Sequence, residues 1–228
     1  MWFVMFWLLT ASSVVAAPPT MMNMPCADWN TRFPQRLTQA TAPETLVRFL
    51  ASHKGFGFVS PFTEEKRIAV LHQPLMSSGQ LIFLPTHGLY RQLQKPFMQE
   101  LVITPEAIHQ RNAADDGATV VALDKLPAAQ VFVGAFLALF AGSWDMLHTH
   151  FEVYFMQDQQ QWQLGLKPIN EAMARLISCL VLEGEQARLV TLWMQETNGD
   201  VTHDHFLDSQ LVPESHWADY QAQFDWTH

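Results

Sequence analysis

Short runs of apolar and polar residues follow one another along the chain from residue 58 onward, separated by clusters of Gly, Pro, Asn and Asp. A run of this kind begins about every ten residues, which is typical of an antiparallel meander. In the run 79–85, Leu81 and Phe83 point to one side of a strand, and Ile82 and Leu84 point to the other. Because both sides are apolar, the pattern predicts a sheet that is covered on both faces, at least in part. The expected strands are 67–73, 79–85, 88–94, 97–103, 106–112, 118–123, 150–157, 161–168, 174–184, 187–196 and 201–208.

Two segments have helical periodicity instead. Residues 42–55 place Glu44 in a first turn, follow it with apolar residues and end at Gly55, which predicts a helix. Residues 128–151 carry an apolar stripe at i, i+4, i+7 and i+8, and they contain no charged residue before Asp145. Because this run is too short to span a bilayer, we expect a helix that is buried or faces something apolar. The stripe consists of Phe132, Phe136, Leu139 and Phe140.

The beginning of the chain has the pattern of an export signal. An apolar run passes into small residues, and Ala16 ends a signal-peptidase-like site. We expect a signal peptide over 1–16; an uncleaved anchor or a misjudged start codon are the alternatives. We then expect an N-terminal extension over 17–42, one folded domain over 43–210 and a C-terminal tail over 211–228, either helical or loose.

Composition and charge exclude some functions. Of 228 residues, 49% are hydrophobic and 15% charged, the net charge is −9, and Lys and Arg form no cluster. This argues against a nucleic-acid partner, because phosphate binding needs a basic patch. The two cysteines, Cys26 and Cys179, could pair in an oxidising compartment or remain unpaired thiols, and their spacing decides nothing.

Catalytic motifs are missing from the sequence: GxSxG, P-loop, GxGxxG and CxxC do not occur. The pairs His148/His150 and His203/His205 could each offer two imidazoles to a metal if they lie on strands, or they could be solvated. No third ligand has a telling spacing, and paired carboxylates lie beside turns. We therefore expect no catalytic residue, no metal site and no cofactor.

A block from Phe62 to Ile108 resembles the LolA-type outer-membrane lipoprotein carriers, in particular divergent LolA-like proteins of Gram-negative bacteria. The same order of motifs continues in 162–168 and 198–206, so the resemblance covers roughly 43–210. The residues that carry it in the first block are Phe62, Glu65, Lys66, Pro74, Leu75, Ser77, Gly79, Leu81, Phe83, Pro85, Gly88, Leu89, Lys95 and Pro96.

The resemblance implies an α+β fold, an incomplete antiparallel β-barrel with helices over an apolar cavity that takes acyl chains. It implies a monomeric periplasmic carrier of an acylated lipoprotein or other lipid, with an inner-membrane donor and an outer-membrane acceptor. From the residues alone, an ordinary packed core explains the same pattern. The expected lipid-binding residues are Leu81, Phe83, Leu89, Phe132, Phe136, Phe140, Phe151, Val153, Phe155, Trp162, Leu164 and Trp193.

One departure from the family concerns the lid. The best-known carriers have an Arg before the Pro of the early strand turn, where this chain has Leu84, and Arg91 follows the turn in another register. The sequence therefore predicts no latch of that kind, and the cargo could be a glycolipid or another acylated molecule.

Two other functions fit the same pattern. The first is a sensor or adaptor that uses the fold to bind a lipidated or protein partner. The second is an enzyme with a carboxylate or imidazole inside the cavity, for which Glu152 and His150 are the candidates, although alternation places them outward.

Overall fold

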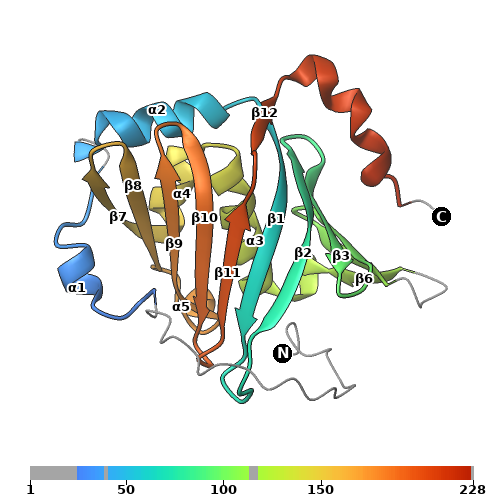
Figure 1. The fold of residues 1–228 in the computed structure, drawn as a ribbon, viewed down its shortest axis with the longest axis horizontal. Helices are drawn as coiled ribbons and strands as arrows, with labels where there is room; N and C mark the ends of the chain where they lie inside the picture. The colour runs from blue at the N-terminus through green and yellow to red at the C-terminus, as the bar shows by residue number, and fades with distance from the viewer. Residues whose placement is uncertain (1–24, 39–40, 113–117, 227–228) are drawn as a thin grey trace.

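The computed structural model describes residues 25–38, 41–112 and 118–226. Its described strands form an antiparallel sheet in the order β6-β5-β4-β3-β2-β1-β11-β10-β9-β8-β7, and β12 pairs with the start of β1. Since β6 and β7 are the two edges of this order, the sheet is curved but not closed (Figure 1). The strands are β1 (Gly57–Arg67), β2 (Leu75–Leu84), β3 (Gly88–Lys95), β4 (Gln99–Ile103), β5 (Ala107–Asn112), β6 (Thr119–Ala122), β7 (Phe151–Asp158), β8 (Gln161–Pro168), β9 (Ile177–Glu185), β10 (Arg188–Glu196), β11 (Val201–Phe206) and β12 (Gln210–Val212).

Helices cover one face and one end of the sheet. Helix α2 crosses the end of the sheet at which β1 begins, while α3 and α4 lie across one face (Figure 1). We call the face that contacts these helices the inner face. No described helix is long and apolar enough to cross a membrane. The helical elements are α1 (Trp29–Arg32), α2 (Glu44–His53), the 3₁₀ turn η2 (Leu123–Lys125), α3 (Pro127–Phe140), α4 (Trp144–His150), α5 (Glu171–Ala174) and the 3₁₀ turns η3 (Glu214–Asp219) and η4 (Gln221–Gln223).

The predicted helix over 42–55 is confirmed as α2. The predicted helix over 128–151 is two helices, because Gly142 turns the chain between α3 and α4 with φ +65°. A side chain at this position would clash with the carbonyl oxygen of Leu50 in α2. Glycine therefore allows both the positive φ of the turn and the close contact between this turn and α2.

Strand β2 confirms that the sheet is apolar on both faces. Leu81 and Phe83 belong to the large cluster on the inner face. Ile82 and Leu84 belong to a separate cluster with Trp217, on the outer face. The C-terminal residues therefore do not form a loose tail: β12 joins the sheet and the 3₁₀ turns after it cover the outer face of β2, β3 and β4 (Figure 1).

A second cover on the outer face comes from the N-terminal side of the chain. Trp29 and Phe33 are buried against Val181 of β9, and a disulfide joins Cys26 to Cys179 in the same strand. The two cysteines are 153 residues apart, so the bridge fixes the start of the described chain to β9, which is separated from the β7 edge of the sheet by β8. The described part of the expected extension 17–42 is thus packed, while the expected signal peptide lies outside the described residues.

One predicted strand is wrong. Residues 67–73 were expected to be extended, but β1 ends at Arg67 and the following residues form turns before β2. Val70 and Leu71 are exposed there. Residues 67–73 therefore have the apolar composition of a strand but do not pack against a neighbouring strand.

Candidate lipid-binding face

The inner face brings together most of the residues that the sequence proposed for lipid binding. Three of them are half-buried against the cluster at its margin, namely Phe132 and Phe136 of α3 and Phe155 of β7. Eight are buried members of the inner cluster: Leu81, Phe83, Leu89, Phe140, Phe151, Val153, Trp162 and Leu164.

Aromatic rings from the helices and the sheet fill the space between them. The ring of Phe140 in α3 lies 5.8 Å from that of Phe83 and 5.7 Å from that of Phe58. At the end closed by α2, the ring of Phe49 lies 4.5 Å from that of Trp162. The expected apolar lining is therefore packed against itself in this conformation.

Helix α3 is anchored unevenly. Its C-terminal half is buried through Leu139 and Phe140, whereas Phe132 and Phe136 stack at 5.9 Å and keep part of their surface exposed. Between them, a Cβ at Gly134 would meet no atom within 4 Å. The N-terminal half of α3 therefore has apolar surface that the protein itself leaves partly uncovered.

Trp193 does not belong to this face, which corrects its assignment as a lipid-binding residue. Leu192 and Met194 contact the inner cluster, while Trp193 lies on the outer face, where its ring stacks at 3.5 Å on His203. The physical reason is a β-bulge between Leu189 and Thr191, which reverses the alternation of the strand at that point.

The inner face changes from apolar to charged along its central strands. On β1 the inward positions pass from Phe58 through Phe62 to Glu64, in the direction away from α2. On β11, Phe206 lies opposite Phe62 and Asp204 lies opposite Glu64. The face thus has one apolar end beneath the helices and one polar end.

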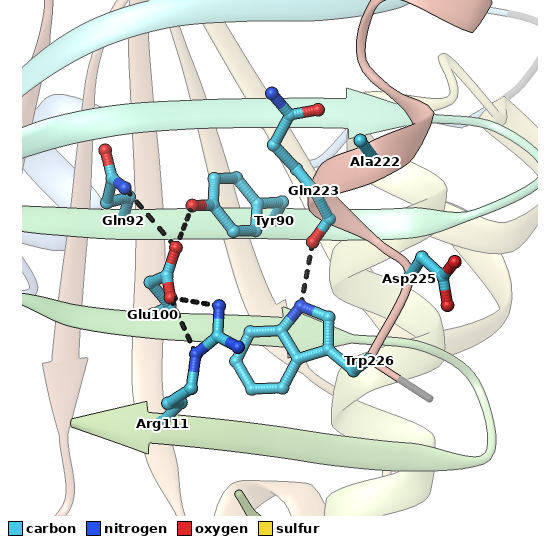
Figure 2. A pocket seen from close by; sticks show the side chains of 8 residues that line it. All are labelled: Tyr90, Gln92, Glu100, Arg111, Ala222, Gln223, Asp225 and Trp226. Carbon is cyan, nitrogen blue, oxygen red and sulfur yellow. Dashed lines mark hydrogen bonds and ion pairs between the residues drawn. The ribbon is translucent and has the colours of Figure 1, made fainter. Parts of the chain in front are cut away.

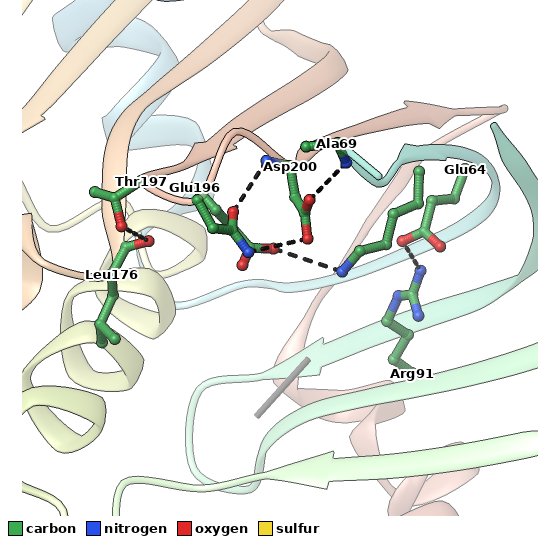
Figure 3. Close-up of polar contacts among 9 residues, drawn as sticks. Glu64, Ala69, Arg91, Leu176, Glu196, Thr197 and Asp200 are labelled. Carbon is green, nitrogen blue, oxygen red and sulfur yellow. Dashed lines mark hydrogen bonds and ion pairs between the residues drawn. The ribbon is translucent and has the colours of Figure 1, made fainter. Parts of the chain in front are cut away.

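Five charged side chains meet at the polar end, which we call the polar floor: Glu64, Lys66, Arg91, Glu196 and Asp204. Arg91 Nη2 lies 2.6 Å from Glu64 Oε2 and 3.7 Å from Asp204 Oδ1. Lys66 Nζ lies 3.5 Å from Glu196 Oε1. Figure 3 shows Arg91 paired with Glu64, and Glu196 lies close by.

Apolar and polar groups both hold Arg91 in place. Its guanidinium lies 4.4 Å above the ring of Phe62, a cation–π contact. On the other side of the ion pair, Ser77 Oγ donates a hydrogen bond of 2.9 Å to Glu64 Oε1.

Burial and the neighbouring Glu64 carboxylate raise the pKa of Asp204 to about 7, although Arg91 acts against them. Burial likewise raises the pKa of Glu196.

A separate polar cleft of about 300 Å³ lies on the outer face between β3, β4, β5 and the C-terminal segment (Figure 2). At its base Glu100 accepts hydrogen bonds from Tyr90 (2.6 Å) and from Arg111 (2.6 and 2.9 Å). The Arg111 guanidinium lies 4.8 Å from the ring of Trp226. The polar groups of this cleft are largely paired with one another, and they hold the C-terminal segment on the sheet.

The histidine pairs and Glu152 lie away from the inner apolar face. His148 and His150 are in α4, where two residues spaced by two do not share a side, so the condition that this pair shares a strand face is not met. Glu152 lies 2.9 Å from Arg36 on the outer face, as alternation predicts. Among the described residues, no group of three or more His, Cys, Asp or Glu could hold a metal ion.

Sequence reasoning missed the polar floor, although one signal for it was present. Arg91 lies between Leu89 and Leu93 on β3, and both leucines are buried in the inner cluster. A charged residue at an inward position of an apolar strand needs a partner. That partner could not be named from sequence, because Glu64 and Asp204 come from strands far away along the chain.

The solved structures that match this chain share little sequence with it. A LolA superfamily protein from Nitrosomonas europaea has 10% identity over 78% of this chain and 98% of its own, with a TM-score of 0.39. The MucA/MucB complex from Pseudomonas aeruginosa matches with 10% identity over 75% of this chain and 57% of the matched chain, at a TM-score of 0.41. A DUF1329 family protein from Desulfovibrio piger has 8% identity over 78% of this chain and 96% of its own, at 0.39.

Among curated proteins, none matches this chain. The family model of LolA-like outer membrane lipoprotein carrier proteins, in contrast, matches residues 35–208. This stretch runs from the segment before α2 to the end of β11 and so contains both the inner apolar face and the polar floor. The chain therefore belongs to the family of LolA-like outer membrane lipoprotein carrier proteins.

Proposed function

We propose that this protein carries the acyl chains of a lipoprotein or another lipid on its inner face and passes them between two membranes. The observation that supports this most directly is the set of apolar side chains between the sheet and α3, with Phe132 and Phe136 half-buried at the margin. Membership of the carrier family supports the same activity.

Such a carrier works only if an acyl chain gains nearly the same free energy in the protein as in a bilayer. An acyl chain gains about 0.8 kcal/mol for each buried CH₂, so a chain of about sixteen carbons gains on the order of 12 kcal/mol. A bilayer offers much the same gain, so cargo can both enter the protein and leave it. The sequence contains no P-loop, so we expect a membrane partner to supply the energy for loading.

We assign to α3 the movement that would expose the inner face to an acyl chain. The helix has no charged residue, so its exposed surface would be apolar once it moved, and an acyl chain would replace the lost contacts. The half of the helix that contains Phe132 and Phe136 is the less buried one, and we expect it to separate from the sheet first.

The periplasm is the proposed location. The bridge between Cys26 and Cys179 is typical of an oxidising compartment, and the family acts in lipoprotein transport. An inner-membrane donor and an outer-membrane acceptor are the proposed partners.

Lipid extraction tests the carrier function. Phe136→Glu places a charge on the apolar margin, and we expect the amount of lipid that copurifies with the protein to fall at least about tenfold, because a buried carboxylate is costly. Val47→Glu is the matched control, since Val47 lies on α2 and is 51% exposed. Equal lipid content in the two folded variants would contradict the proposal.

A further inference from the structure

The polar floor contains buried oxygen atoms that lack a close hydrogen bond within the described part of the chain. Thr202 is 7% exposed and Glu196 is 9% exposed. Thr202 Oγ1, Glu196 Oε1 and Asp204 Oδ1 accept no hydrogen bond from the described residues. Glu196 Oε1 and Asp204 Oδ1 have only longer ionic contacts, at 3.5 Å to Lys66 Nζ and 3.7 Å to Arg91 Nη2. Buried polar atoms in folded proteins nearly always have a partner, so three in one place call for an explanation.

The three atoms lie together at the end of the inner face that is away from α2. Thr202 lies opposite Lys66 on β1 and opposite Met194 on β10. Asp204 lies on the same side of β11, two residues further along, opposite Glu64. The floor therefore continues the apolar face on which we place the acyl chains, and a molecule with tails on Phe62 and Phe206 would place its polar end here.

The chemistry of these atoms favours one kind of polar group. An ionised carboxylate only accepts hydrogen bonds, and a threonine hydroxyl can accept one as well. The floor has three carboxylates, Glu64, Glu196 and Asp204, against two cations, Arg91 and Lys66, and both cations are already paired. An anionic headgroup would be repelled by these carboxylates, whereas hydroxyl or amine donors would supply the hydrogen bonds that Thr202, Glu196 and Asp204 lack.

We propose that the polar floor is the headgroup subsite of the carrier, and that it selects amphiphiles whose headgroup offers hydrogen-bond donors and lacks phosphate. The inference rests on the proposed function, because acyl chains on the inner face bring the headgroup to the floor. Thr202, Asp204 and Glu196 accept the donors, and Arg91 and Lys66 hold the carboxylates in position.

Competition between lipids with the same two acyl chains tests the subsite. Purified full-length protein is equilibrated with vesicles containing equal amounts of monoglucosyl diacylglycerol, phosphatidic acid and diacylglycerol acetate, which has neither donor nor phosphate. Native mass spectrometry then gives the ratio of the lipids bound. We expect the wild type to take the glucosyl lipid over phosphatidic acid by about tenfold.

Two variants connect this preference to the floor. Thr202→Val removes one acceptor without changing the size of the side chain, and we expect the ratio to fall about fivefold, as for one lost hydrogen bond. Asp204→Asn keeps the shape and removes a charge, so we expect the uptake of phosphatidic acid to rise. Thr63→Val is the control, because Thr63 is exposed on the other side of β1.

The outcomes separate the subsite from the carrier function. If the wild type binds all three lipids equally, or if Thr202→Val and Thr63→Val give the same ratio as the wild type, the subsite is refuted and the carrier remains. If the wild type binds none of the three, including diacylglycerol acetate, the carrier function fails and the subsite falls with it.

Discussion

Arg91 and Glu64 form an ion pair of 2.6 Å on the inner face, with 15% and 14% of their side chains exposed. Asp204 of β11 lies on the other side of the same guanidinium, at 3.7 Å. One cation thus contacts two carboxylates from two strands at the polar end of a face whose other end is apolar. The Arg91–Glu64 ion pair stabilises charged side chains next to the apolar surface to which we assign the acyl chains.

Removing Arg91 should destabilise the protein strongly. In Arg91→Ala the carboxylates of Glu64 and Asp204 lose their cation while they stay largely buried, and breaking such a pair costs about 3 kcal/mol. Urea unfolding measures the loss. Arg48→Ala is the control, because Arg48 pairs with Glu44 on the exposed side of α2, and we expect it to cost less than about 0.5 kcal/mol. Similar losses in the two variants would contradict the structural role of Arg91.

The pKa of Asp204 predicts how stability depends on pH. Burial raises this pKa to about 7, above the value of about 4 in an unfolded chain. Between these values the folded state binds the proton more tightly, so Asp204 stabilises the fold below about pH 4 and this contribution is lost as the pH rises through about 7. The charged groups that face it are Arg91, Glu64 and Lys66.

Asp204→Asn isolates that contribution. The variant keeps the side-chain shape and cannot ionise, so we expect its free energy of unfolding relative to the wild type to be higher at pH 8 than at pH 5. Unfolding curves of both proteins at the two pH values give the difference. A constant difference would mean that Asp204 does not titrate in this range.

The disulfide should contribute substantially to stability. Cys26→Ser combined with Cys179→Ser removes a link across 153 residues, and we expect a loss of about 4 kcal/mol. Wild-type protein with a reductant should behave like the double variant in urea unfolding, whereas the double variant should not respond to the reductant. Wild-type unfolding that does not change with the reductant would contradict this role.

The C-terminal segment should be part of the folded domain. Trp217 is 7% exposed, packs in the cluster with Ile82 and Leu84, and donates a hydrogen bond of 3.1 Å to the carbonyl of Val212. We expect Trp217→Ala to cost about 3 kcal/mol and to make the segment sensitive to limited proteolysis. His216→Ala, next to it and exposed, is the control and should leave the cleavage pattern unchanged.

Several features of the fold could be predicted because they depend on local pattern. The two-residue period of 79–85 gave the faces of Leu81 and Ile82 correctly, and Glu44 in the first turn, the apolar residues after it and Gly55 at the end gave α2. The same reasoning failed for 67–73. Val70 and Leu71 are residue types that favour strands, but they are exposed and no neighbouring strand pairs with them.

Sequence by itself determined most of the strand pattern, the apolar α3 and the family, because periodicity and motif order are properties of neighbouring residues. Tertiary structure decided which residues share the inner face. The bulge in β10 turned Trp193 outward, and the pairing of β1 with β11 placed Glu64 opposite Asp204, 140 positions along the chain from 64 to 204. Strand register is set by packing over the whole sheet, so a disulfide partner, a buried charge or a headgroup subsite emerges only when distant strands meet.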